Sequence, residues 1–345
     1  MGNILYVGVD VAKVSLAGGL WFGQHGEDIG LVSNDETGFE QLAEQVEQAQ
    51  QSYQAEQVHL IVEPTAGYEL QLVQFAYQRG WWVSIVHPLT VRDWIKGLGQ
   101  RAKTDRLDGR MMARYGAERQ PRRWHPLPET ITALESLLSR KYDLEQMLRQ
   151  ERNRLEMAQV RPTTAAAVRV NLATMIATLE SSLAEIEAAI ADLLNQHLDL
   201  GEQAQRLDEI PGIGSKIVLP LLVMLHRWDR LTQGQGTGKG LTALVGLDPQ
   251  TQESGSSVRK HAVISKMGNP NLRRLLFMGA LGAIRGDNPL SQFYQGLIER
   301  GKPKMVALVA CAHKLLLWAW AVFRTGEHFD PARCTNRRAS LLQTP

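Results

Sequence analysis

The chain has few cysteines and no long uninterrupted apolar run. Its 345 residues include only Cys311 and Cys334, which excludes a disulfide framework and a zinc module built from several cysteines. The longest apolar stretch, Met305 to Phe323, is interrupted by His313 and Lys314, so we expect a buried helix rather than a membrane span. The first ten residues lack the basic segment of a secretory signal. These absences predict a cytoplasmic protein with no membrane partner.

A dominant charge is also missing. The chain has 38 Lys or Arg and 36 Asp or Glu, for a net charge of +2. This total neither demands nor excludes a nucleic-acid partner, so the local distribution of charge has to decide. Hydrophobic residues make up 44% and charged residues 21% of the chain, which are ordinary globular values. The length predicts two or three domains.

Residues 1–125 carry the pattern of an α/β domain. Apolar and β-branched runs predict strands at 4–12, 15–21, 30–33, 58–62 and 82–86. Apolar residues at helical spacing predict helices at 35–50, 68–78 and 104–118, the first capped by Asp35. Three strands in succession, followed by alternation of strands and helices, indicate an α/β fold. A proline-spaced stretch, 121–128, ends this domain.

Residues 126–204 predict two long helices. The second has apolar residues at alternating spacings of four and three, namely Leu172, Ile176, Leu179, Leu183, Ile186, Ile190 and Leu193. This is the heptad pattern of a coiled coil. It fits a helical hairpin within one chain, with 161–164 at the tip, and it fits a coiled coil with a partner chain equally well.

Residues 205–330 predict a mostly helical domain, and 331–345 a tail. The turn around Gly212 and Gly214, between two apolar helical stretches, resembles a helix-hairpin-helix. Such a turn presents backbone N–H groups to a phosphate, and Lys216 adds positive charge. An ordinary tight turn between helices is the alternative. A glycine-rich insert at 233–240 fails the Walker pattern of a phosphate loop, and we expect a flexible surface loop there.

Four carboxylates of the first domain stand out. Asp10 lies inside the first apolar strand, where a charge is costly unless it is paired or binds a metal. Glu63 ends a second apolar strand, and the spacing of Asp105 and Asp108 puts both on one face of the first turn of a helix. An arginine partner for Asp10 and dipole complementarity for the helix acids are the structural alternatives. Converging carboxylates without His or Cys favour Mg²⁺ or Mn²⁺ over zinc.

A basic run surrounds two of these carboxylates. Between Arg92 and Arg123 there are ten Lys or Arg and four acidic residues, for a local net charge of +6. Such a run is usually a solvated face, but around candidate metal ligands it indicates a phosphate-binding surface. The candidate nucleic-acid contacts within it are Arg101, Lys103 and Arg106.

The segments VGVDVAK, VEPTAGYE and LGQRAKTDRLDG, in this order, resemble the N-terminal RuvC-like (RNase H-fold) domain of the IS110-family transposases. That domain has an Asp-Glu-Asp-Asp tetrad that holds Mg²⁺. The resemblance places the tetrad on Asp10, Glu63, Asp105 and Asp108.

The last domain has a serine-rich segment followed by basic residues. From Ser254 through Arg274 there are five basic residues and no acid: Arg259, Lys260, Lys266, Arg273 and Arg274. Serine is a weak nucleophile unless it is activated, so SGSS alone is typical of a loop. However, GLDPQTQESGSSVRK and ISKMGNPNLRRLLF resemble the C-terminal transposase domain of the same family. The resemblance implies that Ser254 becomes covalently linked to a DNA phosphate, with Ser256 as second candidate and the basic residues as phosphate contacts.

The resemblance therefore implies a site-specific DNA recombinase that excises and inserts an insertion element through a phosphoserine intermediate. It further implies a structured bridge RNA as guide, and a homo-oligomer, either a dimer or a tetramer that is a dimer of dimers. In this assembly one subunit's RuvC-like domain completes a site with another subunit's serine, and the coiled coil joins protomers.

Three rival hypotheses remain open. The first is a metal-dependent Holliday-junction nuclease that hydrolyses DNA with water and uses no serine. The second is an ATPase of the sugar-kinase and actin-like class, because VGVDVAK is also similar to the opening strand of these proteins. Such an enzyme would need further glycine-rich phosphate loops, and we find none that is convincing. The third is a non-catalytic nucleic-acid scaffold.

Overall fold

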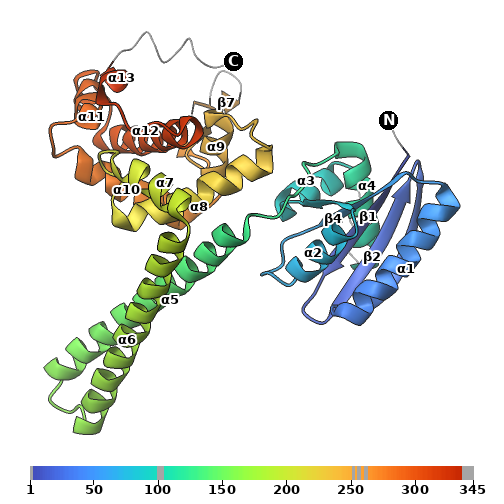
Figure 1. Cartoon of the computed structure of the whole chain (residues 1–345), viewed down its shortest axis with the longest axis horizontal. Helices are drawn as coiled ribbons and strands as arrows, with labels where there is room; N and C mark the ends of the chain where they lie inside the picture. Colours follow the sequence, from blue (N-terminus) through green and yellow to red (C-terminus); the bar gives the residue numbers. More distant parts are fainter. Residues whose placement is uncertain (1–2, 99–104, 251–252, 255–257, 260–262, 336–345) are drawn as a thin grey trace. The chain divides into compact units, whose positions relative to one another are not determined.

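The computed structural model describes residues 3–98, 105–250, 253–254, 258–259 and 263–335. For residues 105–108, 253–254, 258–259 and 335 it describes the backbone alone. The chain divides into two compact units, Met1–Pro126 and Leu127–Pro345 (Figure 1). The further division of the second unit at residue 204 stays a prediction.

A five-stranded sheet forms the centre of the first unit. Its strands are β1 (Ile4–Val11), β2 (Ser15–Phe22), β3 (His25–Ser33), β4 (Gln57–Val62) and β5 (Trp82–Ile85). The spatial order is β3-β2-β1-β4-β5. The first three strands form an antiparallel meander, whereas β4 is parallel to β1 and β5 is parallel to β4. This mixed α/β arrangement is consistent with the RNase H-like fold that the sequence predicts.

Helices cover both faces of this sheet (Figure 1). They are α1 (Glu36–Tyr53), α2 (Leu70–Gln78), α3 (Pro88–Gly97) and α4 (Asp105–Arg119). One face buries Leu5, Val7 and Val9 of β1 in a core shared with α1 and α2. The opposite face carries α4. The predicted cap is confirmed, because the Asp35 carboxylate accepts the N–H of Gly38 at 2.9 Å.

Helix α3 was not expected from the apolar pattern. Its signal lies in the cap: Pro88 occupies the first turn, and Nδ1 of His87 accepts the N–H of Leu89 at 3.2 Å. Proline is well suited to the first helical turn, because its missing N–H has no partner there in any case. The sequence therefore indicates α3 through the residues at its start and not through a stripe of apolar residues.

The second unit begins with a long helical hairpin. Helices α5 (Glu129–Val160) and α6 (Ala166–Gln196) pack side by side, and residues 161–165 form the tip (Figure 1). Leu144 and Leu148 of α5 and Leu179 of α6 form a buried cluster, with Ile176, Leu183 and Ile186 around it. Of the two arrangements that the heptads allow, the chain thus adopts the intramolecular hairpin, and a coiled coil between chains stays a prediction.

The rest of the second unit is built from shorter helices around one core. They are α7 (Leu198–Asp208), α8 (Ser215–Thr232), α9 (Gly238–Val245), α10 (Pro270–Ala283), α11 (Pro289–Glu299), α12 (Lys304–Thr325) and α13 (Pro331–Thr335). Among the described residues, α12 has the length and composition that would allow it to cross a membrane. However, Cys311, Leu315, Leu316 and Ala319 of α12 lie in the main core of this unit, as expected for a buried helix.

The glycine-rich insert, 233–240, is only in part the loop that we expected, because its last three residues belong to a helix. Gly238 begins α9, and the side chain of Thr237 caps this helix by accepting the N–H of Gly240 at 3.1 Å. A Cβ on Gly236 or Gly240 would lie 2.5 or 2.6 Å from the Trp228 ring system. The glycines therefore allow the chain to pack tightly on this tryptophan, which is a packing role rather than a flexible one.

Candidate functional site

The strands that carry the first two predicted carboxylates are neighbours. β1 and β4 are parallel, and their register pairs the residues immediately before Asp10 and Glu63. Both residues therefore lie at adjacent positions at the carboxyl end of the two strands, and both are half-buried. Side chains alternate along a strand, so Asp10 is on the face of Gly8 and Glu63 is on the face of Ile61. Both of these faces meet α4.

Helix α4 approaches this face very closely. A Cβ on Gly8 would lie 2.1 Å from the carbonyl oxygen of Gly109 and 2.4 Å from the nitrogen of Ala113, so a larger residue would force the helix away. A Cβ on Gly109 would lie 2.9 Å from the carbonyl oxygen of Ala17, the residue that pairs with Asp10. Gly109 therefore lies next to the strand position of the first carboxylate.

The direction of α4 places its first turn near the same edge of the sheet. Further along the helix, a Cβ on Gly116 would meet Ile61 at 2.6 Å, deeper in the sheet. The helix thus begins at the carboxyl end of β1 and β4 and runs toward their amino ends. Its first turn contains Asp105 and Asp108, whose side chains lie outside the described part of the chain. The backbone alone brings all four predicted positions to one end of the sheet.

The donor types at these positions suit a hard divalent cation, because all four are carboxylates. Among the side chains that the structure describes, no group of three or more His, Cys, Asp or Glu is arranged to hold a metal ion. Asp10 and Glu63 are among these described side chains, whereas those of the first turn of α4 are not. The close packing of Gly109, the residue after Asp108, against the carboxyl end of β1 is therefore the observation that supports the fit.

Two residues that sequence reasoning missed hold the loops around these carboxylates. Nδ2 of Asn34 donates to the carbonyl of Ala12 at 2.9 Å and to the carbonyl of Tyr68 at 3.2 Å. Glu69, only 5% exposed, accepts the N–H groups of Thr65 and Gly67 at 2.8 and 3.0 Å. The sequence offered only a weak signal for them, a polar residue after β3 and a second acid six residues after the first.

A buried polar cluster lies toward the amino end of β4. Nε2 of His59, a residue 4% exposed, is 2.8 Å from Oγ of Ser84, which also donates to the carbonyl of Arg122 at 2.8 Å. Burial, with a smaller contribution from the Arg123 guanidinium, lowers the pKa of His59 to about 4, so its ring is neutral at pH 7. Arg123 itself lies 3.0 Å above the centroid of the Trp82 ring. This cluster fixes the segment after α4 against β5.

The basic residues between Arg92 and Arg123 do not form one uniform surface. Arg92 and Lys96 on α3 are exposed, as a phosphate-binding face requires. Arg114, in contrast, forms an ion pair with Glu118 at 2.8 Å and lies over the Trp21 ring. Of the three predicted contacts, Arg101 and Lys103 lie outside the described residues, and Arg106 is described by its backbone alone. Their contact with nucleic acid stays a prediction.

The predicted serine lies on an arm of very short strands. β6 (Pro249–Gln250) pairs with β9 (Val263–Ile264), and β7 (Glu253–Ser254) pairs with β8 (Val258–Arg259), both antiparallel. Ser254 is opposite Val258 in the outer pair, and Ser256 lies outside the described residues. At the base, the N–H of Ser265 donates to the carbonyl of Asp248 at 2.9 Å, and the two side chains are hydrogen-bonded. Sequence reasoning missed this Asp–Ser pair.

The basic residues after the serine have different surroundings. Lys266 and Arg274 are exposed. Arg273 is half-buried and donates to the carbonyl of Val245, the last residue of α9, at 3.0 Å. Arg273 therefore also helps to close the end of a helix. Arg259 is described by its backbone alone, and Lys260 lies outside the described residues, so the proposed contacts of all five with DNA stay predictions.

The turn between α7 and α8 is packed closely against α10. Gly212 has a φ of +98°, and a Cβ there would lie 2.8 Å from the carbonyl oxygen of Gly279 on α10. Gly214 precedes the first residue of α8 without a side-chain cap, and Gly214 and Lys216 are both exposed. The amino end of α8 thus presents backbone N–H groups and a lysine to solvent, which is the arrangement expected for a phosphate contact.

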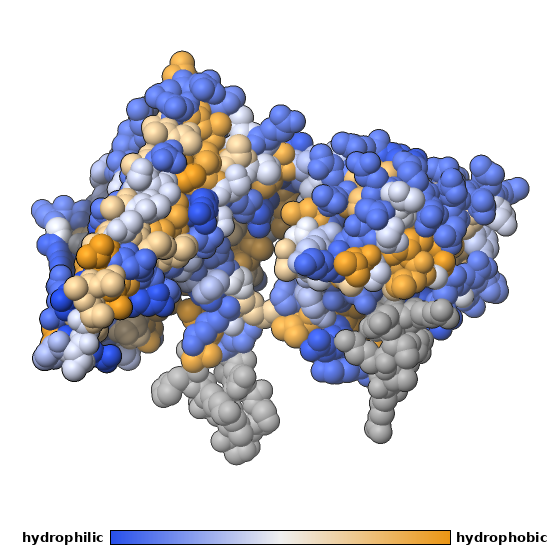
Figure 2. All heavy atoms as spheres, turned by 90° about the horizontal axis from the view of Figure 1, so that it is seen from below, coloured by the Kyte–Doolittle hydropathy of each residue, from blue (hydrophilic) through white to orange (hydrophobic). Residues whose placement is uncertain are grey.

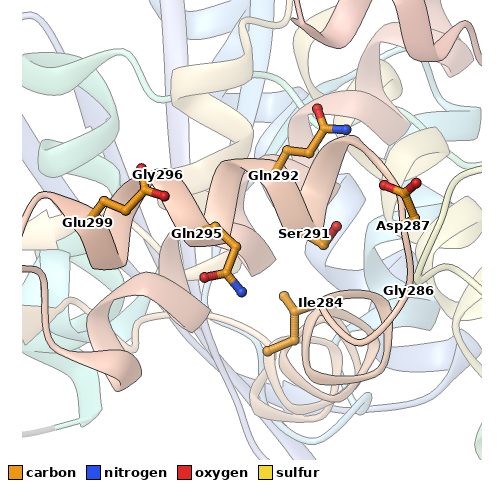
Figure 3. Close-up of a pocket in the computed structure, with 8 residues that line it drawn as sticks. All are labelled: Ile284, Gly286, Asp287, Ser291, Gln292, Gln295, Gly296 and Glu299. Carbon is orange, nitrogen blue, oxygen red and sulfur yellow. The ribbon is translucent and has the colours of Figure 1, made fainter.

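A polar groove of about 470 Å³ lies between the end of α10 and α11 (Figure 3). Its lining residues are Ile284, Gly286, Asp287, Ser291, Gln292, Gln295, Gly296 and Glu299. They include two acids and no base, so the groove does not suit a phosphate backbone. None of the predicted site residues lines it.

Comparison with known families covers most of the chain. A transposase model for the DEDD type of IS110 matches residues 7–158, which include all four predicted carboxylates. A second model, for the IS116/IS110/IS902 family of transposases, matches residues 204–295, which include the α7–α8 turn and the serine arm.

Individual relatives extend over the full length. The chain is 31% identical to a pilin gene-inverting protein of Moraxella bovis over 335 residues, which is 94% of this chain and 97% of that protein. A pilin gene-inverting protein of Moraxella lacunata is also 31% identical over 330 residues. An uncharacterized 43.6 kDa protein of the insertion element IS110 from Streptomyces coelicolor is 28% identical over 165 residues, 46% of this chain and 37% of that protein. The chain therefore belongs to the IS110 family of transposases and is an enzyme of DNA recombination.

Proposed function

We propose that this protein is a site-specific recombinase that excises and inserts an IS110-type insertion element in the cytoplasm, with a RuvC-like carboxylate site and a serine nucleophile. The observation that carries the proposal is the glycine packing of α4, which brings the first turn of this helix to the strand ends that hold Asp10 and Glu63. The names of two relatives describe inversion of a pilin gene, which supports DNA recombination as the reaction class.

In this proposal Asp10, Glu63, Asp105 and Asp108 hold Mg²⁺ or Mn²⁺ beside the scissile phosphate. When bound, the metal supplies positive charge that polarises the phosphate and stabilises the leaving oxygen. The fold would hold the four carboxylates close together before the metal and the DNA bind. The strand pairing of β1 with β4 fixes two of them, and the tight contact of α4 fixes the backbone of the other two.

Ser254 is the proposed nucleophile. Its Oγ bonds to the scissile phosphorus, its proton passes to a nearby base or water, and the bond from phosphorus to one sugar oxygen breaks. The departing sugar oxygen takes up a proton and becomes a free hydroxyl. One phosphodiester is replaced by another, so its energy is conserved for rejoining. Ser256 remains the second candidate for this role.

Several basic positions would hold the DNA. Exposed Lys216 and the N–H groups at the start of α8 suit one phosphate, and exposed Lys266 and Arg274 suit others. Arg101, Lys103, Arg106, Arg259, Lys260 and Arg273 complete the proposed interface.

The proposed partners are DNA, a bridge RNA and further copies of this chain. The exposed part of the α5–α6 hairpin carries apolar side chains, Met157 at 52%, Val160 at 72% and Val170 at 66% exposure. Figure 2 shows hydrophobic areas in orange among hydrophilic blue ones on one face of the protein. Apolar surface of this kind marks interaction sites, and it supports contact between protomers. The bridge RNA rests on the family resemblance.

The decisive experiment is a trapping assay with element-end DNA, RNA transcribed from the flanking region and Mg²⁺. We expect a denaturation-resistant DNA–protein adduct that maps to Ser254 by mass spectrometry. Ser254→Ala and Asp10→Asn should each abolish it, whereas Ser257→Ala, a neighbouring serine, should keep it. An adduct that survives Ser254→Ala and disappears in Ser256→Ala would move the nucleophile to Ser256. Recombination by protein freed of all RNA would refute the guide.

The alternative is a junction-resolving nuclease that uses water. It is favoured by one observation: the carboxylate end belongs to a compact unit, Met1–Pro126, that does not contain the serine. Metal-dependent nicking that persists in Ser254→Ala and leaves no adduct in the wild-type protein would establish this alternative.

A further inference from the structure

The loops that follow the two carboxylate-bearing strands are tied together by one side chain. Asn34 stands between β3 and α1, and its Nδ2 donates at once to the carbonyls of Ala12 and Tyr68. Its backbone N–H donates to the carbonyl of Val14 at 3.1 Å. Ala12 lies two residues after Asp10, and Tyr68 lies in the loop that follows the other carboxylate strand. One amide therefore joins three segments that are far apart in the sequence.

A second side chain shapes the loop after Glu63. The carboxylate of Glu69 accepts the N–H groups of Thr65 and Gly67, and it is almost completely buried. The hydroxyl of Thr65 donates to the carbonyl of Glu63 itself at 3.3 Å. A buried charge is costly unless it is hydrogen-bonded. Two N–H groups at short distance stabilise it and fix the loop at the same time.

The amide of Asn34 is not optimised for stability. Its Oδ1 is buried and has no hydrogen-bond partner among the described residues. A buried acceptor without a partner destabilises a fold, and such groups occur where another requirement prevails. Here the other requirement is the position of Nδ2, which donates to two carbonyls at the same edge of the sheet.

We propose that Asn34 and Glu69 are positioning residues that set the separation of Asp10 and Glu63 for the binding of a divalent cation. This inference rests on the proposed function, because it assumes that these two carboxylates bind the metal. Neither residue touches the metal or DNA in this proposal. Each acts through the backbone of a loop, as outer-shell partners of metal ligands commonly do.

The chain offers a matched control at the other end of the same sheet. Nε2 of Gln57, at the start of β4, donates to the carbonyl of Gly80 at 2.9 Å. Gln57 thus also ties a loop to the sheet through a side-chain amide, but it does so far along β4 from Glu63. Asn34→Ala and Gln57→Ala both remove side-chain amide bonds to loop carbonyls, and the loops that they release lie at opposite ends of the sheet.

The test is the binding of Mn²⁺ alone to the full chain, measured by electron paramagnetic resonance in the absence of nucleic acid. The wild-type protein is first compared with Asp10→Ala, to identify the site that depends on the carboxylates. We expect Asn34→Ala to weaken binding at that site by about tenfold or more, and Gln57→Ala to change it less than about twofold. At a Mn²⁺ concentration that just saturates the wild type, the melting temperature of Gln57→Ala should rise as that of the wild type does, and that of Asn34→Ala should rise clearly less.

Glu69 gives an independent measurement if Asn34→Ala does not fold. Glu69→Gln keeps an acceptor oxygen and should retain the Mn²⁺ affinity of the wild type, whereas Glu69→Leu should lose it to the same extent as Asn34→Ala. Asp10-dependent binding that is unchanged in Asn34→Ala or Glu69→Leu would overturn the inference alone. Absence of any Asp10-dependent binding in the wild type would instead overturn the proposed function, and the inference with it.

Discussion

The carboxylate end of the first unit and the serine arm of the second differ in how firmly the fold holds them. Asp10 lies near the end of β1 and Glu63 directly follows β4, two neighbouring strands of a five-stranded sheet, and the backbone of α4 packs closely on Gly8 of the same sheet. Ser254 lies in a strand pair of two residues per strand, beyond a base fixed by Asp248 and Ser265. In the roles proposed above, the carboxylates must converge on one ion and need sub-ångström placement, whereas the serine must reach a large substrate and can be carried on an arm.

The contact between α4 and β1 should be the most sensitive point of this comparison. Gly8→Ala would push Cβ into the Gly109 carbonyl, so we expect the free energy of unfolding of the first unit to fall by about 3 kcal/mol or more. Urea unfolding followed by tryptophan fluorescence measures this loss. Gly97→Ala on α3, where a Cβ meets nothing within 4 Å, should cost far less. Equal losses in both variants would contradict the close packing.

The first unit should also lose stability in mild acid. His59 has a pKa of about 4 when folded, against an ordinary histidine pKa of 6.5, so the unfolded chain binds a proton first as the pH falls. Stability is therefore fully present above about pH 6.5 and declines toward pH 4, by up to about 3 kcal/mol. Thermal unfolding between pH 7 and pH 4 measures the decline. His59→Gln keeps a polar partner for Ser84 and should flatten this dependence; an unchanged slope would mean that other groups cause it.

The base of the serine arm should respond more weakly. Asp248→Ala removes the partner of Ser265, so we expect a loss of about 1 to 2 kcal/mol in the second unit. Hydrogen exchange at the Ser265 N–H, which donates to the Asp248 carbonyl, should become faster because the β6–β9 pair would open at this end, while exchange in α12 should stay slow. The yield of the DNA–protein adduct should fall by a larger factor than the folded fraction of the protein does. If exchange at the Ser265 N–H were unchanged, the hydrogen bond between the Asp248 and Ser265 side chains would not anchor the arm.

The smallest effects are expected for two neighbouring arginines, Arg273 and Arg274, which differ in burial. Arg274 is exposed, so Arg274→Ala should weaken DNA binding and reduce the slope of log K against log salt by about one, with little effect on unfolding. Arg273 donates to the end of α9, so Arg273→Ala should also lower the melting temperature. Salt-dependent binding and thermal unfolding of both variants test this pair. A lower melting temperature for Arg274→Ala than for Arg273→Ala would contradict the role of Arg273 at the end of α9.

Local pattern was enough to predict most elements of this protein. The apolar runs that became β1, β4 and β5, the Asp35 cap and the heptads of α6 all act within a few residues, so their physics is legible in the sequence. The order of the carboxylates and of the serine motif likewise indicated the family that the comparisons support. The choice between a hairpin and a partner coiled coil was not legible, because identical heptads serve both.

Contacts between distant segments had to come from the tertiary structure. Nothing in Gly8 or Gly109 alone states that a helix and a strand meet there, and the glycines at 236 and 240 suggested flexibility although they pack on Trp228. Asn34 is an ordinary loop residue until Ala12 and Tyr68 are brought to it. Sequence patterns report periodicity and local caps, whereas the separation of two loops depends on the packing of the whole sheet, which no short window of sequence contains.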